Sequence, residues 1–118
     1  MIRTKCVYDK KEEGDGLRVL VTRHWPRGVR KEKQDIWLRE LGPGQGLIKL
    51  WKSQAITWAE FKKRYLYEYE AETKKKALNE LKGAVKSARG KTVTLLCACM
   101  DEKRCHRGIL KGMLYRAG

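Results

Sequence analysis

The most reactive side chains of this sequence gather near its end, between positions 97 and 107. Three of its four cysteines, Cys97, Cys99 and Cys105, lie there together with His106, one of only two histidines. A thiol beside an imidazole supplies a nucleophile and a base, and thiolates are also good metal ligands. The segment follows an apolar run that is typical of a buried strand, and a helical pattern comes after it. We therefore treat it as the first candidate for a functional site.

Covalent chemistry by Cys97 is the first interpretation of this cluster. A cysteine at the carboxyl end of a buried strand lies where backbone amides and the dipole of a following helix lower a thiol pKa. In this interpretation His106 removes the proton, and Arg107 adds positive charge beside the site. Cys105 can instead act as a resolving thiol that forms a reversible disulfide with Cys97, which predicts a redox sensor. A further interpretation is inert burial, the common fate of an intracellular cysteine.

Metal binding is another alternative, and the spacing disfavours it. Cys97, Cys99, Cys105 and His106 together would supply the four ligands of a tetrahedral zinc site. Structural zinc sites separate paired ligands by roughly two to four residues, whereas Cys105 and His106 are adjacent. Adjacent side chains on a helix point about 100° apart, so both would not reach one ion. We therefore expect no metal and no other cofactor.

The second candidate segment is Arg23-His24-Trp25-Pro26-Arg27-Gly28, which follows the apolar run 17–22. The proline keeps the preceding residue out of the helical region and the glycine allows a positive φ, which predicts an ordered loop at a strand end. Arg23 and Arg27 can hold a phosphate while Trp25 offers a stacking face to a base. Alternatively, Trp25 fills the core and the arginines bond backbone carbonyls.

Strand and helix patterns alternate around these segments. Runs with strand character cover 2–8, 17–22 and 92–97, and the last two are apolar and rich in β-branched residues, as central strands are. Apolar residues at helical spacing predict a helix capped by Thr57, another over 77–88, and one that closes the chain.

Two more helix assignments depend on local signals. Apolar side chains over 34–41, followed by Gly42-Pro43-Gly44, predict a short helix. Asp101 is expected to cap the closing helix, with 102–105 in its first turn.

This order of elements predicts a single α/β domain over 1–118, a layered sandwich with a largely parallel central sheet flanked by helices. Ligands of such sheets bind beyond the carboxyl ends of the strands. The loop after 17–22 and the cysteine segment after 92–97 can therefore open on the same edge and form one basic pocket.

The charge of the chain points to an anionic partner. Its 28 lysines and arginines against 14 acidic residues give a net charge of +14 over 118 residues, and such a field concentrates anions. The partner can be a small anion, a nucleic acid bound by the lysines of 62–91, or solvent alone. No run reaches the roughly 18 apolar residues of a membrane span and the start lacks a secretory signal, so we expect a cytoplasmic protein without membrane contact. The oligomeric state has no signature in the sequence.

Over nearly its whole length the chain resembles the YeaO-like proteins, a bacterial and archaeal domain of unknown function. The residues that carry the resemblance are Val7-Tyr8-Asp9, 15–28, Lys31-Glu32, 58–65 and 92–96. The ending Cys105-His106-Arg107, together with a strand cysteine like Cys97, resembles a related branch of the broader family.

The resemblance implies an α/β fold and an activity that is not assigned. It names Arg23, Arg27, Asp101 and His106 as shared features, and Cys97, Cys105 and Arg107 as features of the related branch. Many YeaO-like members lack these cysteines, so a thiol mechanism is not the general function of the family.

Together, the residues predict an uncharacterised protein with a basic pocket beside a reactive cysteine. Arg23, Arg27 and Arg107 are the candidate anion-binding residues, and Cys97, Cys105 and His106 are the candidate catalytic residues. The ligand is expected to be phosphorylated or otherwise anionic. A nucleic-acid-binding protein and a thiol redox sensor are the alternatives, and the sequence leaves open whether the chain is an enzyme.

Overall fold

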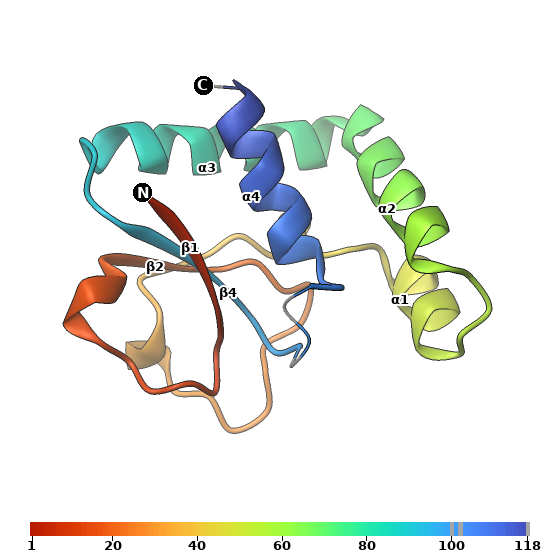
Figure 1. Ribbon diagram of the computed structural model, residues 1–118, viewed down its shortest axis with the longest axis horizontal. Coiled ribbons are helices and arrows are strands. Elements are labelled where there is room, and N and C mark those ends of the chain that lie inside the picture. The colour runs from red at the N-terminus through yellow and green to blue at the C-terminus, as the bar shows by residue number, and fades with distance from the viewer. Residues whose placement is uncertain (100, 102, 118) are drawn as a thin grey trace.

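A four-stranded sheet lies at the centre of the molecule, and its pairings among the described residues are all parallel. The computed structural model describes residues 1–99, 101 and 103–117. The strands are β1 (Ile2–Cys6), β2 (Leu17–Leu20), β3 (Ile36–Trp37) and β4 (Val93–Cys97), in the spatial order β1-β4-β2-β3. β4 is central and pairs with both β1 and β2 (Figure 1). The predicted α/β fold with a largely parallel sheet is confirmed.

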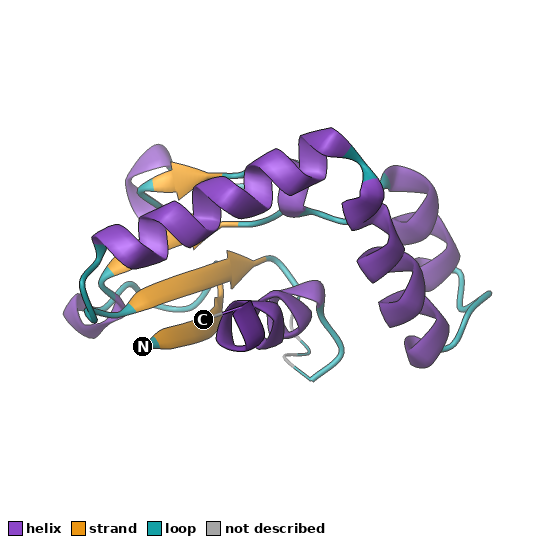
Figure 2. Cartoon of the chain, turned by 90° about the horizontal axis from the view of Figure 1, so that it is seen from above, coloured by secondary structure: helices purple, strands orange, loops and turns teal. Residues whose placement is uncertain are grey.

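Helices occupy most of the rest of the described chain. The α-helices are α1 (Gln45–Lys52), α2 (Trp58–Tyr67), α3 (Glu72–Ser87) and α4 (His106–Ala117), and short 3-10 turns cover Glu13–Asp15, Lys31–Lys33, Arg39–Leu41 and Glu68–Glu70. α3 and α4 run along the sheet, whereas α1 and α2 stand together at one end of it (Figure 2). No described helix is long and apolar enough to cross a membrane.

The main hydrophobic core lies between one face of the sheet and the helices. Its buried members include Val19, Val93 and Leu95 from the strands and Leu47, Phe61, Leu81 and Leu110 from the helices. Because successive strand residues face opposite sides, Leu20 and Leu96 point away from this core and pack with Val7 in a smaller cluster. β4 is buried at all of its positions, as the apolar run in the sequence predicts.

The helices predicted around Thr57 and over 77–88 are present, and Thr57 caps α2 by accepting a hydrogen bond from the Glu60 N–H at 3.2 Å. The helix predicted over 34–41 is wrong. Asp35 exchanges backbone and side-chain hydrogen bonds with Arg18 of β2, and Leu38 N–H donates to Leu20 O. These bonds extend the sheet to β3, so pairing with an open strand edge prevails over the local helical pattern.

A buried aspartate links three strands of the sheet. Asp15 is fully buried, and its carboxylate pairs with Lys5 of β1 and Arg18 of β2. Its carbonyl accepts a hydrogen bond from Thr94 Oγ1 of β4 at 2.7 Å. The next residue, Gly16, has φ of 61°, and a Cβ there would clash with the carbonyl of Thr92. Asp15 and Gly16 therefore connect side chains of β1 and β2 with the first residues of β4.

Candidate thiol site

The carboxyl ends of β2 and β4 bring the two predicted segments together. The strands are parallel neighbours with Leu20 opposite Leu96, and Val21 N–H donates to Leu96 O at 3.0 Å. The chain therefore leaves β2 toward Arg23 at the same edge where β4 ends in Cys97. The prediction that these distant segments are neighbours is confirmed, because residues of both line one cavity.

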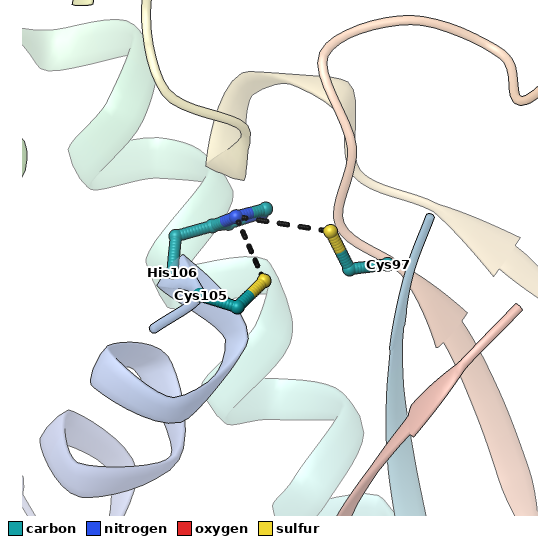
Figure 3. A group of neighbouring side chains, drawn as sticks. All are labelled: Cys97, Cys105 and His106. Atoms are coloured by element: carbon teal, nitrogen blue, oxygen red, sulfur yellow. Dashed lines mark hydrogen bonds between the residues drawn. The ribbon is translucent and has the colours of Figure 1, made fainter. Parts of the chain in front are cut away.

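Cys97, Cys105 and His106 converge at this edge (Figure 3). His106 Nδ1 lies 3.9 Å from Cys97 Sγ and 3.7 Å from Cys105 Sγ, and the three donor atoms all lie within 4.8 Å of one another. All three residues are buried. The expectation that Cys105 and His106 cannot face one point is wrong, because α4 begins at His106 and Cys105 precedes the helix.

The turn between β4 and α4 explains this geometry. Asp101 Oδ1 accepts hydrogen bonds from the N–H groups of Lys103 and Arg104 at 3.0 and 3.3 Å, which holds a local turn. Asp101 thus bonds to backbone donors as expected, but the predicted helical first turn over 102–105 is wrong for the described residues 103–105. The part of that prediction that concerns Glu102 lies outside the described residues.

The imidazole of His106 is held in one orientation. Nε2 lies 2.7 Å from the carbonyl oxygen of Val21. A carbonyl can only accept, so Nε2 carries a proton, and in the neutral ring Nδ1 presents its lone pair to the two sulfurs. Tyr65 packs edge-on against the ring with centroids 5.6 Å apart. A thiol, an imidazole nitrogen that can accept its proton and a carbonyl that orients the imidazole therefore lie together. The contribution of Val21 is a backbone atom, so its residue type gives no signal in the sequence.

The thiols of the site differ in their affinity for a proton. A hydrogen bond from Cys105 lowers the pKa of Cys97; burial works in the opposite direction, and the Cys99 N–H, at 3.5 Å, and the Arg107 charge lower it further. The same hydrogen bond, together with burial, raises the pKa of Cys105 to about 12. Burial also raises the pKa of Cys99. Cys97 is therefore the thiol of the three that ionises most readily.

Arg107 lies behind Cys97 and does not line the cavity. Its side chain is fully buried, and Nη1 donates to the carbonyl oxygens of Lys5 at 2.9 Å and Cys97 at 3.4 Å. Nε and Nη2 have no hydrogen-bond partner in the described part of the chain. None of the ion pairs between described residues includes Arg107. Arg107 is thus not placed to touch a ligand in the cavity, and its charge acts on Cys97 instead.

A cavity of about 500 Å³ opens beside the thiols. The described lining includes three cations, Arg23, Lys52 and Arg104, and three aromatic side chains, Trp25, Trp51 and Phe61. It also includes the thiols and the imidazole of Cys97, Cys99, Cys105 and His106. None of the described lining residues carries a carboxylate. A wall of this composition is suited to a ligand that combines an anionic group with an apolar or aromatic part.

The residues of the loop after β2 have separate roles. Arg23 lines the cavity, and three of its N–H groups bond to Pro43 O, Gly42 O and the Glu40 carboxylate. Arg27 is exposed and is not among the described lining residues, so the structure does not bring it to the thiols. Trp25 is 38% exposed and donates to Val29 O at 2.8 Å, so it does not fill the core.

The described lining residues that lie between the two predicted segments in the sequence escaped prediction: these are Pro43, Ile48, Trp51, Lys52 and Phe61. Lys52 belongs to α1, a helix whose glycine-containing start gave no clear pattern, and Phe61 was assigned only to the buried face of α2. A larger hollow of about 710 Å³ shares Trp25 with this cavity, but its described lining includes Glu32 and Asp35 and holds no thiol. The chemistry-bearing groups therefore lie in the smaller cavity.

The fold and the site together define a parallel α/β protein with a thiol–imidazole cluster at the carboxyl edge of its sheet. Over residues 2–118 the sequence matches the family described as the Active DUF488-N3 subclade, and the chain belongs to this family. The predicted likeness to YeaO-like proteins of unknown function is thereby confirmed.

Two similar proteins are described as uncharacterized. The chain is 33% identical to the uncharacterized protein YeaO of Escherichia coli (strain K12) over 116 residues, which is 96% of both chains. It is 31% identical to the uncharacterized protein Rv3073c of Mycobacterium tuberculosis (strain ATCC 25618 / H37Rv) over 115 residues, 96% of this chain and 92% of that one. No solved structure matches the chain significantly.

Proposed function

We propose that the protein is a thiol-dependent enzyme that holds an anionic ligand in the cavity and attacks it with Cys97. The observation that carries this proposal is the relay of Cys97 Sγ, His106 Nδ1 and the Val21 carbonyl at the edge of the cavity. Contacts in such relays are often long before a ligand binds, so a separation of 3.9 Å suits a base that acts in the complex.

In the proposed step, the Cys97 proton passes to His106 Nδ1. The sulfur electron pair forms a bond to an electrophilic carbon or phosphorus of the ligand. The bond to the leaving group breaks, and that group departs with the bonding electrons and takes the proton from His106. Hydrolysis of the sulfur-bound intermediate by water then restores the thiol. Cys105 serves as the hydrogen-bond donor that stabilises the Cys97 thiolate.

The charge of the lining supports an anionic ligand. Arg23, Lys52 and Arg104 approach the cavity from three different segments, and the described lining contains no acidic residue. Arg23 pairs with the Glu40 carboxylate at 3.1 Å, so Lys52 and Arg104 are the cations of the lining without an ion pair among the described residues and carry most of the attraction. Arg104 and Lys52 are exposed, so both can move toward a ligand, whereas Arg23 is fixed by its bonds to the loop before α1. The cations therefore attract anions into the cavity, and the thiolate lies at its wall.

Alkylation with two reagents of similar size and different charge tests this proposal. We expect iodoacetamide to modify Cys97 before Cys105 and before Cys6, a cysteine at the end of β1 that is equally buried. At Cys97, the ratio of the iodoacetate rate to the iodoacetamide rate should be about ten times the same ratio for the small thiol N-acetylcysteinamide, because a cationic cleft concentrates anions. Added salt should remove this preference. Peptide mass mapping after short reaction times measures both rates.

Matched variants distinguish the effect of the cations at the cavity from the effect of the net charge of the protein. Arg104→Gln and Lys52→Gln should each lower the preference for iodoacetate, whereas Lys82→Gln, an equal change of charge on the exposed face of α3, should leave it unchanged. His106→Gln should slow the reaction of Cys97 with both reagents. The proposal would be contradicted if Cys97 and Cys6 reacted at equal rates. It would also be contradicted if Cys97 preferred iodoacetate over iodoacetamide no more strongly than N-acetylcysteinamide does.

Nucleic-acid binding is a second candidate, favoured by the exposed lysines of α2 and α3. Lys62, Lys63, Lys75, Lys76 and Lys82 are all exposed. Binding of a fluorescent duplex DNA should then weaken with salt, with a log–log slope of about −0.9 for each phosphate contacted. A flat response to salt, measured by fluorescence anisotropy, would exclude this function.

A further inference from the structure

The donor atoms of Cys97, Cys105 and His106 have a property that nucleophilic attack does not require. Attack needs one sulfur and one base, whereas here two sulfurs and one imidazole nitrogen surround a common point. We propose that these three residues bind one zinc(II) ion, with the fourth coordination position open to the cavity. The inference goes beyond the proposed function and does not depend on it.

The separations between the donor atoms are close to those of a zinc site. With Zn–S bonds of about 2.3 Å and Zn–N bonds of about 2.0–2.1 Å, tetrahedral geometry places sulfur about 3.6 Å from nitrogen and about 3.8 Å from the other sulfur. His106 Nδ1 lies 3.9 and 3.7 Å from the two sulfurs, and no pair of donors is more than 4.8 Å apart. The two nitrogen–sulfur distances therefore need to change by only a few tenths of an ångström, and the two sulfurs have to approach each other by at most about 1 Å, to admit the ion.

The hydrogen bond of His106 to Val21 is an independent observation that points the same way. Metal-binding histidines donate their second ring N–H to a carbonyl or carboxylate, which fixes the tautomer and aims the other nitrogen at the ion. His106 Nε2 lies 2.7 Å from Val21 O, in the buried part of the site. The bond leaves Nδ1, the nitrogen that faces both sulfurs, as the ligand atom.

The surroundings of the sulfurs also suit ligands that carry negative charge. The Cys99 N–H lies 3.5 Å from Cys97 Sγ, and the fully buried guanidinium of Arg107 has no ion pair within the described residues. Two thiolates neutralise the charge of a zinc ion, and Arg107 then leaves one positive charge in the site. This remaining positive charge favours an anion, such as hydroxide or a ligand oxygen, in the fourth coordination position.

Cys99 does not complete the set. Its Sγ lies 3.6 Å from Asp101 O and is not among the three converging donors. Cys97, Cys105 and His106 all line the 500 Å³ cavity, so the side of the ion without a protein ligand faces that space. Three protein ligands with one open position is the arrangement of catalytic rather than structural zinc sites.

Zinc would mask the nucleophile of the proposed function. The electron pair of Cys97 that attacks a ligand in the metal-free protein would be shared with the ion, so zinc-loaded protein should resist alkylation at Cys97 and Cys105. Removal of the metal with a chelator should restore the reaction. Cys6 lies outside the three-donor set and should react at the same rate in both forms, which makes it an internal reference in every sample.

Cobalt(II) provides the direct test, because it takes zinc sites and reports their ligands by its absorption. The intact chain is reduced, stripped with a chelator and titrated with cobalt(II), and then with zinc(II) in competition. We expect one ion per chain, a thiolate-to-cobalt charge-transfer band, the intense visible bands of tetrahedral cobalt, and their loss when zinc displaces it. Absence of the charge-transfer band in the unmodified chain would overturn the proposal.

Variants then assign the ligands. Cys97→Ser, Cys105→Ser and His106→Gln should each lower the zinc affinity by more than the roughly 10- to 100-fold expected for loss of a neighbouring hydrogen-bond partner. Cys6→Ser should leave binding unchanged, and Cys99→Ser should leave both affinity and stoichiometry unchanged. If Cys99→Ser abolishes binding as completely as Cys97→Ser, the site is closed by four protein ligands and the open position is refuted.

A measurement without variants covers the case in which a substitution prevents folding. Zinc should protect Cys97 and Cys105, but not Cys6, from N-ethylmaleimide in the intact chain, as read by peptide mass mapping. Equal labelling with and without zinc would refute the metal site while leaving the proposed thiol chemistry intact. Conversely, a zinc-binding chain whose Cys97 is no more reactive than Cys6 after chelation would refute the thiol chemistry alone.

Discussion

Replacing the buried carboxylate of Asp15 tests most directly which interactions hold the sheet together. Asp15→Asn keeps the shape of the side chain and removes its charge. Asp15 is fully buried and is paired with Lys5 Nζ at 3.0 Å and with Arg18, whose side chain is 1% exposed. Its Oδ2 also accepts the Glu12 N–H at 3.0 Å. The substitution therefore removes the buried counter-ion of Arg18 and leaves Lys5 only the exposed carboxylate of Glu12.

The expected loss follows from this burial. Removing one partner of a buried ion pair typically destabilises a protein by about 3–5 kcal/mol, a large share of a total stability of roughly 5–15 kcal/mol. At roughly 4 °C per kcal/mol for a chain of this size, Tm should fall by about 12–20 °C. Glu12→Gln is the matched control, because Glu12 also pairs with Lys5 Nζ, at 3.1 Å, but its side chain is 61% exposed. Its loss should be about 0–1 kcal/mol.

Urea unfolding followed by circular dichroism measures both variants against the unmodified chain. Equal losses for Asp15→Asn and Glu12→Gln would refute the reasoning, because burial would then make no difference to the pair. A small loss for Asp15→Asn would show that the two cations find water or other partners once the carboxylate is gone.

The free energy of unfolding should also depend on pH through the carboxylate of Asp15. Burial raises the pKa of Asp15, but the Glu12 N–H and the charges of Lys5 and Arg18 together outweigh it and hold the pKa below its ordinary value. The unfolded chain therefore binds this proton at a higher pH than the folded chain does. The stabilisation is present above about pH 4 and is lost as the pH falls through the lower folded value. The urea midpoint should drop between pH 5 and pH 3, and the drop should be smaller in Asp15→Asn.

Two further predictions concern the edge of the cavity. Gly42→Ala would press a Cβ against the backbone of Arg23, and we expect a loss of about 1–3 kcal/mol in urea unfolding. In Gly46→Ala nothing lies within 4 Å of the added methyl group, so this α1 control should be neutral or slightly stabilising. Diamide should oxidise Cys97 and Cys105 to one intramolecular disulfide, with reduction of the reagent, because their sulfurs lie within 4.8 Å. Mass mapping that finds this pair no more often than pairs with other cysteines would contradict the geometry.

Sequence pattern predicts most of the scaffold because burial dictates it. The run 92–97 reads as a strand covered on both faces, and β4 is buried at every position. Its parallel pairing with β2 follows from the alternation of strands and helices, and it brings Arg23 and Cys97 to one edge. The helix predicted over 34–41 is wrong because Ile36 and Trp37 pair with the edge of β2 instead. This pairing depends on a strand that is distant in the sequence, so the residues of 34–41 alone do not reveal it.

The site depends on details that residue types do not carry. Arg107 looks like an anion-binding group in the sequence, but its partners are the carbonyls of Lys5 and Cys97, and backbone atoms have no residue-specific signature. Arg27 follows the same strand as Arg23, yet the loop turns it toward solvent. In both cases the charge is visible in the sequence, whereas the direction of the side chain is set by packing.

The position of one helix boundary decides what the thiol cluster can do. If α4 began directly after Asp101, Cys105 and His106 would lie on a helix with their side chains about 100° apart, and only one of them could face Cys97. Because Asp101 bonds to the N–H groups of Lys103 and Arg104, α4 begins only at His106 and Cys105 lies before the helix. The side chains of Cys105 and His106 can therefore both face Cys97. A change at Asp101 that moved this boundary would separate the donors without altering any of them. For that reason Asp101→Ala should weaken cobalt binding, whereas Asp9→Ala, another carboxylate bound to a backbone N–H near the end of a strand, should not.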